Sequence, residues 1–272
     1  MKVALYQARS GIEPEANAAE LSRAVREAKS GGAAMLFTPE MSGLLDQDRA
    51  RAAESLRSEE EDLVLGAVRA AAAEAGIWVH LGSLALRGGE GGRLVNRGFV
   101  IDEAGGIRAR YEKIHLFDVD LATGESWRES ASYAPGERAV VTETPLGPLG
   151  LSICYDLRFS GLYAALSGAG ATALSIPAAF TVPTGEAHWH VLIRARAIES
   201  ACFAIAAAQC GAHEDGRRTF GHSLVVDPWG RLLLDMETAE REVGFAELDL
   251  PQTDEVRARL PVLRHRRAFA AP

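Results

Sequence analysis

The sequence predicts an α/β protein in which two β-sheets pack face to face and helices cover the outer faces. The chain has 272 residues, of which 47% are hydrophobic and 24% charged, a composition typical of one large folded domain. About a dozen short apolar segments with few amphipathic ones between them favour two sheets over one. The segments LSIC and ALSI are apolar throughout, as strands buried on both faces must be.

The first half of the chain alternates strands with amphipathic helices. The segment 15–30 has apolar residues at helical spacing and is followed by Gly31 and Gly32, which favour a helix end. The turns between the later strands are rich in glycine. We therefore expect strands at residues 3–8, 34–38, 78–86, 97–101 and 107–113, and helices at residues 15–30 and 54–75.

The second half repeats this rhythm without a repeat of fixed period or a low-complexity linker. We expect strands at residues 139–144, 149–154, 173–177, 203–209, 223–227, 231–236 and 244–248, and helices at residues 161–167 and 186–200. This pattern predicts a single domain over residues 1–272, with 250–272 as a C-terminal tail. The arginine-rich segment 256–267 indicates either a solvated chain end or an arm that docks on a partner.

Charge and hydropathy exclude several classes of protein. A net charge of −8 argues against nucleic-acid binding, which normally needs a basic surplus. The sequence has no run of eighteen apolar residues, so no membrane-spanning helix is expected. The first residues turn polar after Ala8, which is too early for the apolar core of a signal peptide. Three cysteines cannot all pair within one chain. We therefore expect a cytoplasmic protein without a disulfide scaffold and without a membrane partner.

Cys154 stands apart from the other two cysteines. It ends the expected strand 149–154, and the polar segment that follows leads into a helix. Such a strand-to-helix turn exposes a side chain at the edge of a sheet, and the next backbone N–H can hold an oxyanion. Taken alone, Cys154 is either a nucleophile or a buried structural thiol, whereas Cys202 and Cys210 flank the apolar run FAIAAAQ and are expected to be buried.

A thiol nucleophile needs a base, and histidine is the commonest one. His188 and His190 suggest a metal pair, but residues two apart on a helix point to different sides, and spacing places no third ligand. We expect structural polar contacts for both. The alternative base is a carboxylate at another strand end, where Glu40 follows MLFTP as either a cap or a site residue.

Lys113 is one of only three lysines beside 26 arginines, and it ends the strand 107–113. Its ammonium would lower the pKa of Cys154 and stabilise an oxyanion, unless it is simply a surface cation. Glu129, in the segment WRES, would by itself be a loop charge. The residues alone therefore leave the roles of Lys113 and Glu129 open.

At these residues the sequence resembles the nitrilase superfamily of carbon–nitrogen hydrolases. The motifs are FTPEM with Glu40, YEKIHLFDVD with Lys113, and ICYDLRF with Cys154, and the second glutamate of that family falls on Glu129. The similarity extends from VALYQ near the start to LPVLRHRR near the end. Three motifs in the right order imply a Glu–Lys–Cys catalytic set assisted by Glu129.

Within the superfamily, the chain is most similar to the branch of deaminated glutathione amidase and omega-amidase. The stretches HWHVLIRARAIESACFAIAAAQCG and FGHSLVVDPWG carry this resemblance. The chain departs from it at Ser160–Gly161, where the family usually has Pro or Ala followed by Glu, and at Phe220, where a tyrosine is common. These departures leave the catalytic set untouched and put the substrate assignment in question.

The resemblance implies a four-layer α-β-β-α sandwich and hydrolysis of a small carboxylate-bearing ω-amide to an acid and ammonia. Glu40 would take the Cys154 proton, the thiolate would form a thioester, and Lys113 with the Tyr155 N–H would hold the oxyanion. No metal or organic cofactor is implied. Members of this family generally form homodimers, and helix 186–200 and the C-terminal tail are the interface candidates, unless both pack only on their own core.

Substrate recognition is expected close to the nucleophile. Arg158 lies four residues after Cys154 and would pair with a substrate carboxylate, or else with Asp156 or a neighbouring loop. Thr184 would add a hydroxyl donor. The competing functions are a nitrilase, carbamoylase or aliphatic amidase of the same superfamily, a catalytically idle binding partner, and a histidine-assisted cysteine hydrolase.

Overall fold

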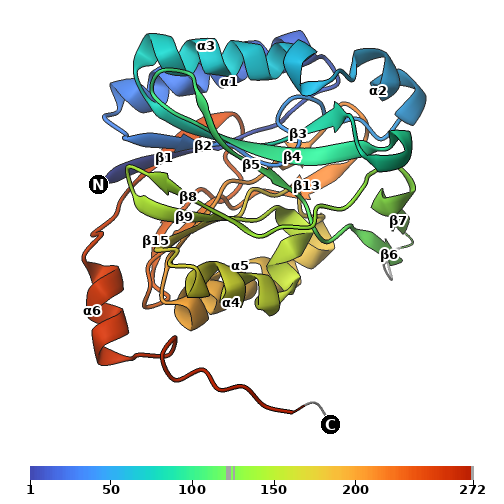
Figure 1. Ribbon diagram of the computed structural model, residues 1–272. Helices are drawn as coiled ribbons and strands as arrows, with labels where there is room; N and C mark the ends of the chain where they lie inside the picture. Colours follow the sequence, from blue (N-terminus) through green and yellow to red (C-terminus); the bar gives the residue numbers. More distant parts are fainter. Residues whose placement is uncertain (121–123, 125, 271–272) are drawn as a thin grey trace.

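Two six-stranded sheets lie face to face between two pairs of helices in a computed structural model that describes residues 1–120, 124 and 126–270 (Figure 1). The first sheet has the strand order β16-β1-β2-β3-β4-β5, and the second has the order β15-β14-β11-β10-β9-β8. Helices α1 and α3 cover the first sheet, and α4 and α5 cover the second (Figure 1). The predicted α-β-β-α sandwich is thus confirmed.

The strands of the first sheet are β1 (Lys2–Gln7), β2 (Met35–Phe37), β3 (Trp78–Arg87), β4 (Leu94–Ile101), β5 (Ile107–Glu112) and β16 (Glu242–Glu247). Those of the second are β8 (Val140–Thr144), β9 (Gly147–Leu151), β10 (Ala173–Ser175), β11 (Phe203–Ala206), β14 (Leu224–Val226) and β15 (Leu232–Asp235). The helices are α1 (Pro14–Ser30), α2 (Arg49–Ser55), α3 (Leu63–Ala75), α4 (Ser160–Gly168), α5 (Val182–Ser200) and α6 (Gln252–Arg259).

Alternation along the central strands separates two hydrophobic layers. Val3 and Leu5 of β1 face the second sheet and belong to the core between the sheets, whereas Ala4 and Tyr6 face helices α1 and α3. All four are at most 2% exposed. The central strands are therefore buried on both faces, which explains why their sequences read as continuous apolar runs.

The centre of each sheet is parallel, and this arrangement positions the site. Strand β2 pairs in parallel with β1 and β3, and β10 pairs in parallel with β9 and β11. Parallel neighbours need crossovers, which the helices provide. The carboxyl ends of parallel strands meet at one edge of a sheet, where side chains from different crossovers converge. Glu40 follows β2, and Cys154 follows β9.

The expected helix 54–75 is wrong in its first part. The structure has α2, an extended segment with one 3-10 turn (Glu59–Glu61), and then α3. Leu56 has an extended backbone, and the Asp62 carboxylate accepts the N–H of Leu65 at 2.8 Å. An aspartate cap begins a new helix because it satisfies an orphan donor, and apolar spacing alone does not reveal that interruption.

Other differences lie at element ends and in short hairpins. The strand expected at 149–154 ends at Leu151, the strand expected at 203–209 ends at Ala206, and α5 begins four residues before the expected start. Two hairpins were not predicted, β6 (Asp118–Asp120) with β7 (Ser126–Arg128), and β12 (Cys210–Ala212) with β13 (Arg218–Phe220).

The C-terminal tail contains helix α6, which the sequence analysis did not predict. Thr253 and Val256 of this helix are buried, and the Arg257 guanidinium donates to the Ala171 carbonyl at 2.6 Å. Further along, Arg266 donates to the Ala164 carbonyl of α4 at 2.8 Å. Much of the tail therefore packs on its own chain. Residues 271–272 of the expected tail lie outside the described residues.

Candidate active site

Glu40, Lys113 and Glu129 meet in a buried ion-pair cluster beneath Cys154. Lys113 Nζ lies 2.9 Å from Glu40 Oε1 and 2.9 Å from Glu129 Oε2. The Lys113 side chain is 3% exposed and that of Glu40 is 5% exposed. Burial of ions is stable only where each charge is paired and hydrogen-bonded, as it is here. The structure thus brings together the four residues that the sequence analysis proposed as catalytic.

Each Glu40 oxygen has a different set of partners. Oε1 accepts from Lys113 and from the amide nitrogen of Asn96 at 2.9 Å, and Oε2 accepts from the Ala179 N–H at 3.0 Å. A carboxylate held at both oxygens has a fixed orientation. The Glu40 carboxylate also lies close enough to the Cys154 thiol for its charge to raise the pKa of this thiol. Glu40 is therefore placed to take the proton of this thiol.

Asn96, which the sequence analysis missed, connects the two carboxylates. It is 1% exposed in β4, and its amide nitrogen also lies 3.3 Å from Glu129 Oε1. Glu129 is held further by the Phe117 N–H at 2.7 Å. An uncharged polar side chain in the largely apolar strand LVNRGFV was the available signal, but a strand position does not by itself reveal two carboxylate partners.

Cys154 begins the 3-10 helix Cys154–Arg158 with a strained backbone. Its φ of 48° lies in the left-handed region, where a residue with a side chain is uncommon. Its N–H donates to the Pro177 carbonyl at 2.8 Å, and the first hydrogen bond within the helix is donated by Asp156 to Ile153 O. Within the described part of the chain, the helix thus leaves the Tyr155 N–H unused. This is the sharp strand-to-helix turn that the sequence predicted.

Asp156 holds this turn in place from below. Its fully buried carboxylate accepts from the Tyr111 hydroxyl at 2.6 Å, from the Ile153 N–H at 2.9 Å, and from the His115 N–H at 3.0 Å. The His115 ring stacks on Phe159 at a centroid distance of 3.6 Å. These contacts lock the backbone around the nucleophile position, and they show that Asp156 is not the partner of Arg158.

The ionisation states in the cluster follow from burial and charge. Burial opposes ionisation of Glu40, but the Lys113 ammonium and the surrounding hydrogen bonds outweigh it and hold the pKa of Glu40 below the usual carboxylate value. Burial also opposes the Lys113 charge, but Glu129 and Glu40 raise the pKa of Lys113 well above its usual value. Both ions are therefore charged at neutral pH.

The expected effect of Lys113 on Cys154 is present but is outweighed. Burial and the negative charge of Glu40 raise the pKa of this thiol more than the Lys113 ammonium lowers it, so the pKa lies well above the usual thiol value. The resting cysteine is a protonated thiol beside a carboxylate base.

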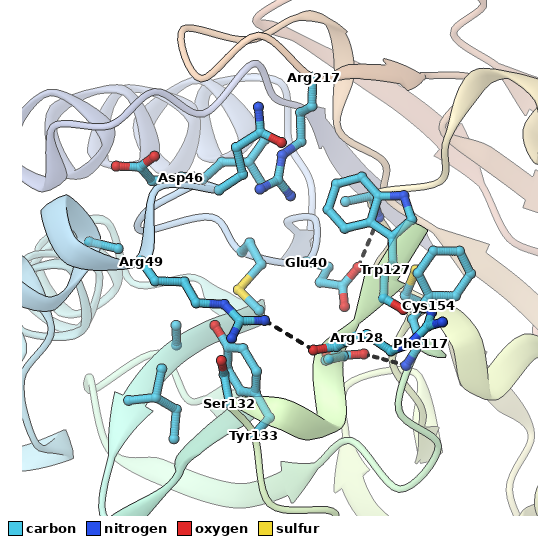
Figure 2. Close-up of a pocket in the computed structure, with 18 of the residues that line it drawn as sticks. Glu40, Asp46, Arg49, Phe117, Trp127, Arg128, Ser132, Tyr133, Cys154 and Arg217 are labelled. Carbon is cyan, nitrogen blue, oxygen red and sulfur yellow. Dashed lines mark hydrogen bonds between the residues drawn. The ribbon is translucent and has the colours of Figure 1, made fainter. Parts of the chain in front are cut away.

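A cavity of about 900 Å³ opens above the cluster (Figure 2). All seven residues proposed from the sequence line it, namely Glu40, Lys113, Glu129, Cys154, Tyr155, Arg158 and Thr184. Among the described residues, seven arginines and three carboxylates contribute to its wall. The carboxylates Glu40 and Glu129 already bind Lys113. The cavity therefore offers a positive surround in a chain of net charge −8.

Arg158 lies on this wall without a carboxylate partner among the described residues. Its guanidinium is 3.2 Å from His188 Nδ1 and lies over the rings of Phe180 and Tyr155, at 5.4 and 5.8 Å from their centroids. Aromatic faces hold a guanidinium without neutralising it. The pairing with Asp156 that the sequence left open is thus not formed.

Thr184 contributes to the wall from the first turn of α5. Its hydroxyl lies 2.8 Å from the Thr181 hydroxyl and donates to the Thr181 carbonyl at 3.3 Å. A threonine hydroxyl has a single proton, so a hydrogen bond to substrate would replace the local one. The donor role of Thr184 remains a prediction.

The other two cysteines lie away from the cavity. Cys202 and Cys210 are at most 2% exposed, and burial raises the pKa of each to about 11. All three cysteines are free. The structure thus confirms the expectation that Cys202 and Cys210 are buried.

One cluster of side chains of the types that bind metal ions occurs among the described residues. His190, His222 and Asp235 converge outside the cavity lining. Within the cavity itself, the Lys113 ammonium occupies the position between the two glutamates where a cation would otherwise sit.

No helix in the described part of the chain is long and apolar enough to cross a membrane.

Comparison with known proteins agrees with this arrangement. The family model described as carbon-nitrogen hydrolase matches residues 2–258. The chain is 39% identical over 267 residues to a deaminated glutathione amidase of Yersinia enterocolitica, an alignment that covers 97% of this chain and 92% of that protein.

Solved structures show the same fold. The Caenorhabditis elegans NitFhit protein superimposes with a TM-score of 0.90 and 36% identity over 98% of this chain and 65% of that longer one. Nit3 of Saccharomyces cerevisiae, a member of the nitrilase superfamily, superimposes with a TM-score of 0.87 and 26% identity over 98% of this chain and 97% of its own. The chain belongs to the carbon–nitrogen hydrolase family and is an amidase.

Proposed function

We propose that this amidase hydrolyses a small ω-amide that carries a remote carboxylate, through a thioester on Cys154. The observation that supports it most is the buried contact of Glu40, Lys113 and Glu129 directly beneath the thiol. Deaminated glutathione, the substrate in the name of the Yersinia relative, and 2-oxoglutaramate are the candidate substrates. The first would release an amine and the second ammonia.

Acylation starts from the neutral thiol and the charged carboxylate. As the sulfur attacks the amide carbonyl, its proton passes to Glu40 Oε2, the oxygen that Lys113 and Asn96 leave open. Lys113 remains an ammonium throughout because its pKa is raised well above the usual value. The base therefore acts during attack, and no free thiolate has to accumulate beside two carboxylates.

The oxyanion of the tetrahedral intermediate requires donors near Cys154. We assign this role to the Tyr155 N–H, for which no acceptor occurs among the described residues, and to the Lys113 ammonium. Preorganised donors of this kind each typically contribute about 100- to 1000-fold in rate. Glu129 holds the Lys113 ammonium in position for this role. Asn96 donates to both Glu129 and Glu40 and so fixes the two carboxylates.

Collapse of the intermediate breaks the carbon–nitrogen bond. Glu40 gives its proton to the leaving nitrogen, which departs as ammonia or an amine and leaves an acyl group on sulfur. Water then enters, Glu40 takes one of its protons, and the hydroxide attacks the thioester carbonyl. The sulfur leaves and recovers the proton from Glu40. One amide and one water are thus converted into one acid and one amine.

The positive wall of the cavity supports a carboxylate-bearing substrate. Arg158 lines the cavity without a carboxylate partner among the described residues, whereas Arg217, which stacks on Trp127 at 5.1 Å, is already paired with Asp215 at 2.7 Å. Guanidinium groups bind carboxylates with two parallel hydrogen bonds. A substrate with an anionic end distant from its amide would therefore satisfy this wall. Figure 2 shows Arg49 across the cavity from Cys154, and Arg217 at its upper edge.

A matched substrate panel tests this proposal. It contains deaminated glutathione, 2-oxoglutaramate, 2-oxosuccinamate, the neutral amides of equal length, and the corresponding nitriles, with release of amine or ammonia as the readout. We expect kcat/KM to be highest for a carboxylate-bearing amide. Preference for neutral amides or for nitriles would contradict the proposal and favour an aliphatic amidase or a nitrilase.

We further propose that two copies pair through the outer face of α5, in a cytoplasmic enzyme. The inner face of this helix buries Trp189 and Ile193, while Val191 is 68% exposed and Ile198 is 44% exposed. Trp229 lies beyond β14 and is 53% exposed. Exposed apolar residues grouped in this way are typical of interfaces. Sedimentation measures the oligomeric state. We expect the wild type to be a dimer and Val191→Asp to dissociate more readily, and a monomeric wild type would contradict this proposal.

A further inference from the structure

We propose that His190, His222 and Asp235 form a binding site for a divalent transition-metal ion of the Zn²⁺ class, separate from the cavity of the amidase. The three come from α5, from the segment after β13, and from β15. One ligand atom of each lies within 4.8 Å of the other two. This inference does not depend on the proposed substrate.

The ligand atoms already face one point. His190 Nε2 is 2.9 Å from Asp235 Oδ2, and His222 Nδ1 is 2.9 Å from Asp235 Oδ1. A four-coordinate ion with ligands at about 2.0–2.2 Å holds them slightly further apart than this, so a small movement of the side chains opens the site. Two imidazoles and one carboxylate form a ligand set that suits Zn²⁺, Co²⁺ or Ni²⁺ and leaves a position for water.

Aromatic packing fixes the two imidazole rings. The His222 ring stacks on Phe220 with a centroid distance of 4.4 Å and an interplanar angle of 22°, and the His190 ring lies edge-on to both. The indole N–H of Trp189 donates to the His222 carbonyl at 2.7 Å. The backbone of His222 has a φ of 54°, in the left-handed region. The rings are thus preorganised before any ion arrives.

The charge at this cluster also points to a cation. Among the described residues, both ion-pair contacts of Asp235 are to histidines, and no lysine or arginine is paired with it. A carboxylate whose ion-pair contacts are all to histidines can give its charge to a dication.

The neighbouring histidine of α5 supplies an internal control. His188 lies two residues before His190, and its Nδ1 faces Arg158, whereas His190 Nε2 faces Asp235. Residues two apart on a helix point to different sides, so spacing alone does not pair them. The additional ligands come from distant parts of the chain, which is why the sequence pattern did not reveal this site.

The place of the cluster indicates a structural ion. None of its three residues lines the described cavity, but Thr219, one residue before Phe220, does. The Phe220 N–H donates to the carbonyl of Phe180, which also lines the cavity, at 3.0 Å. A bound ion would therefore join α5, β15 and the segment behind this wall, and stabilise the folded chain by binding it in preference to the unfolded one.

The test is a titration of chelator-treated protein with Co²⁺ and Zn²⁺. The full-length Cys154→Ala variant serves as the parent, so that the thiol in the cavity cannot bind the metal. We expect one equivalent of Co²⁺ to give the visible absorption of a four-coordinate ion, one equivalent of Zn²⁺ to displace it, and the melting temperature to rise. Asp235→Asn and His190→Gln should each weaken binding by about 10- to 100-fold or more, and His188→Gln should not.

Two results would overturn the proposal. One is a parent protein that binds no stoichiometric Co²⁺ or Zn²⁺, which would make the cluster a hydrogen-bonded trio only. The other is undiminished binding in both Asp235→Asn and His190→Gln, which would place the metal elsewhere. Circular dichroism without metal verifies that each variant is folded, and His222→Gln replaces any variant that is not.

Discussion

Lys113 Nζ lies 2.9 Å from Glu40 Oε1 and is also bound by both oxygens of Glu129, at 3.1 and 2.9 Å. A compact ammonium with three donors fits between these two carboxylates, and a planar guanidinium does not. The chain otherwise uses arginine for nearly all its cations. Replacing Lys113 by arginine therefore tests the shape of the cation separately from its charge.

We therefore expect Lys113→Arg to lower kcat by about 100-fold or more, because an oxyanion donor is misplaced. Steady-state kinetics on the best substrate of the panel measures it. Lys2→Arg and Lys29→Arg are matched controls, since each ammonium contacts a backbone carbonyl far from the cavity. If Lys113→Arg retained most of its activity, the lysine would be only a generic counter-charge.

Asn96 is expected to act as a positioning residue for Glu40. Replacing it by alanine removes hydrogen bonds to two charged carboxylates, each worth about 1.5–3 kcal/mol. Asn96→Ala should lower kcat by about 10- to 100-fold with little change in KM, and it should move the acid limb of the kcat/KM profile to higher pH, because Glu40 loses a donor to its ionised form.

Asn17→Ala is the control for this variant. Asn17 is also buried, and its amide binds the carbonyls of Gly11 and Gly43 away from the catalytic cluster. It should cost stability without shifting the pH profile. An unshifted acid limb in Asn96→Ala would show that Asn96 contributes to packing and not to the state of Glu40.

Arg158 is expected to anchor the substrate carboxylate. Arg158→Met keeps an unbranched apolar stem and removes the charge, so kcat/KM for carboxylate-bearing amides should fall by about 2–5 kcal/mol in transition-state stabilisation. Neutral amides of equal length should lose much less, because they have no group to pair with the guanidinium. Equal loss for both kinds of amide, or a much lower melting temperature, would make Arg158 structural.

His80 predicts a loss of stability in mild acid. It is 1% exposed in β3, its Nδ1 lies 3.0 Å from the Ser175 hydroxyl of β10, and burial lowers its pKa from 6.5 to about 3. A folded-state pKa below the unfolded value means that this contribution is complete above about pH 6.5 and is lost as the pH falls towards 3.

Urea unfolding between pH 7 and pH 4 measures this effect. Below about pH 6, each unit of pH in that window should cost about 1.4 kcal/mol through His80. His80→Gln cannot take up the proton and should show a flatter dependence, whatever its stability at pH 7. An identical slope in wild type and variant would show that other groups govern the acid transition.

The sequence predicted the layers of the fold better than the exact ends of the strands or the contacts at the site. Continuous apolar runs marked the strands, and charged or nucleophilic residues directly after them marked Glu40, Lys113 and Cys154. The interruption before Leu63 was missed because a single aspartate cap decides it. Asn96 was missed because its partners are 56 and 33 residues away along the chain.

The net direction of the Cys154 shift needed the folded site for a related reason. From sequence, a lysine near a cysteine predicts a lowered thiol pKa. In the structure the lysine does lower it, but the thiol is only 8% exposed, and burial and the Glu40 carboxylate raise the pKa more. Which of these effects is largest depends on burial and on how close each charge lies, and both are properties of the folded site.

The most direct test of the account is the mass of the protein during turnover. When the wild-type enzyme is mixed with its best amide substrate and quenched in acid, a fraction of the protein should gain the mass of the acyl group. Peptide mapping should place this mass on Cys154. Cys154→Ala should show neither adduct nor turnover with its fold intact, whereas Cys202→Ala and Cys210→Ala should lose stability and keep the adduct. Turnover in Cys154→Ala, or an adduct on another residue, would contradict the account.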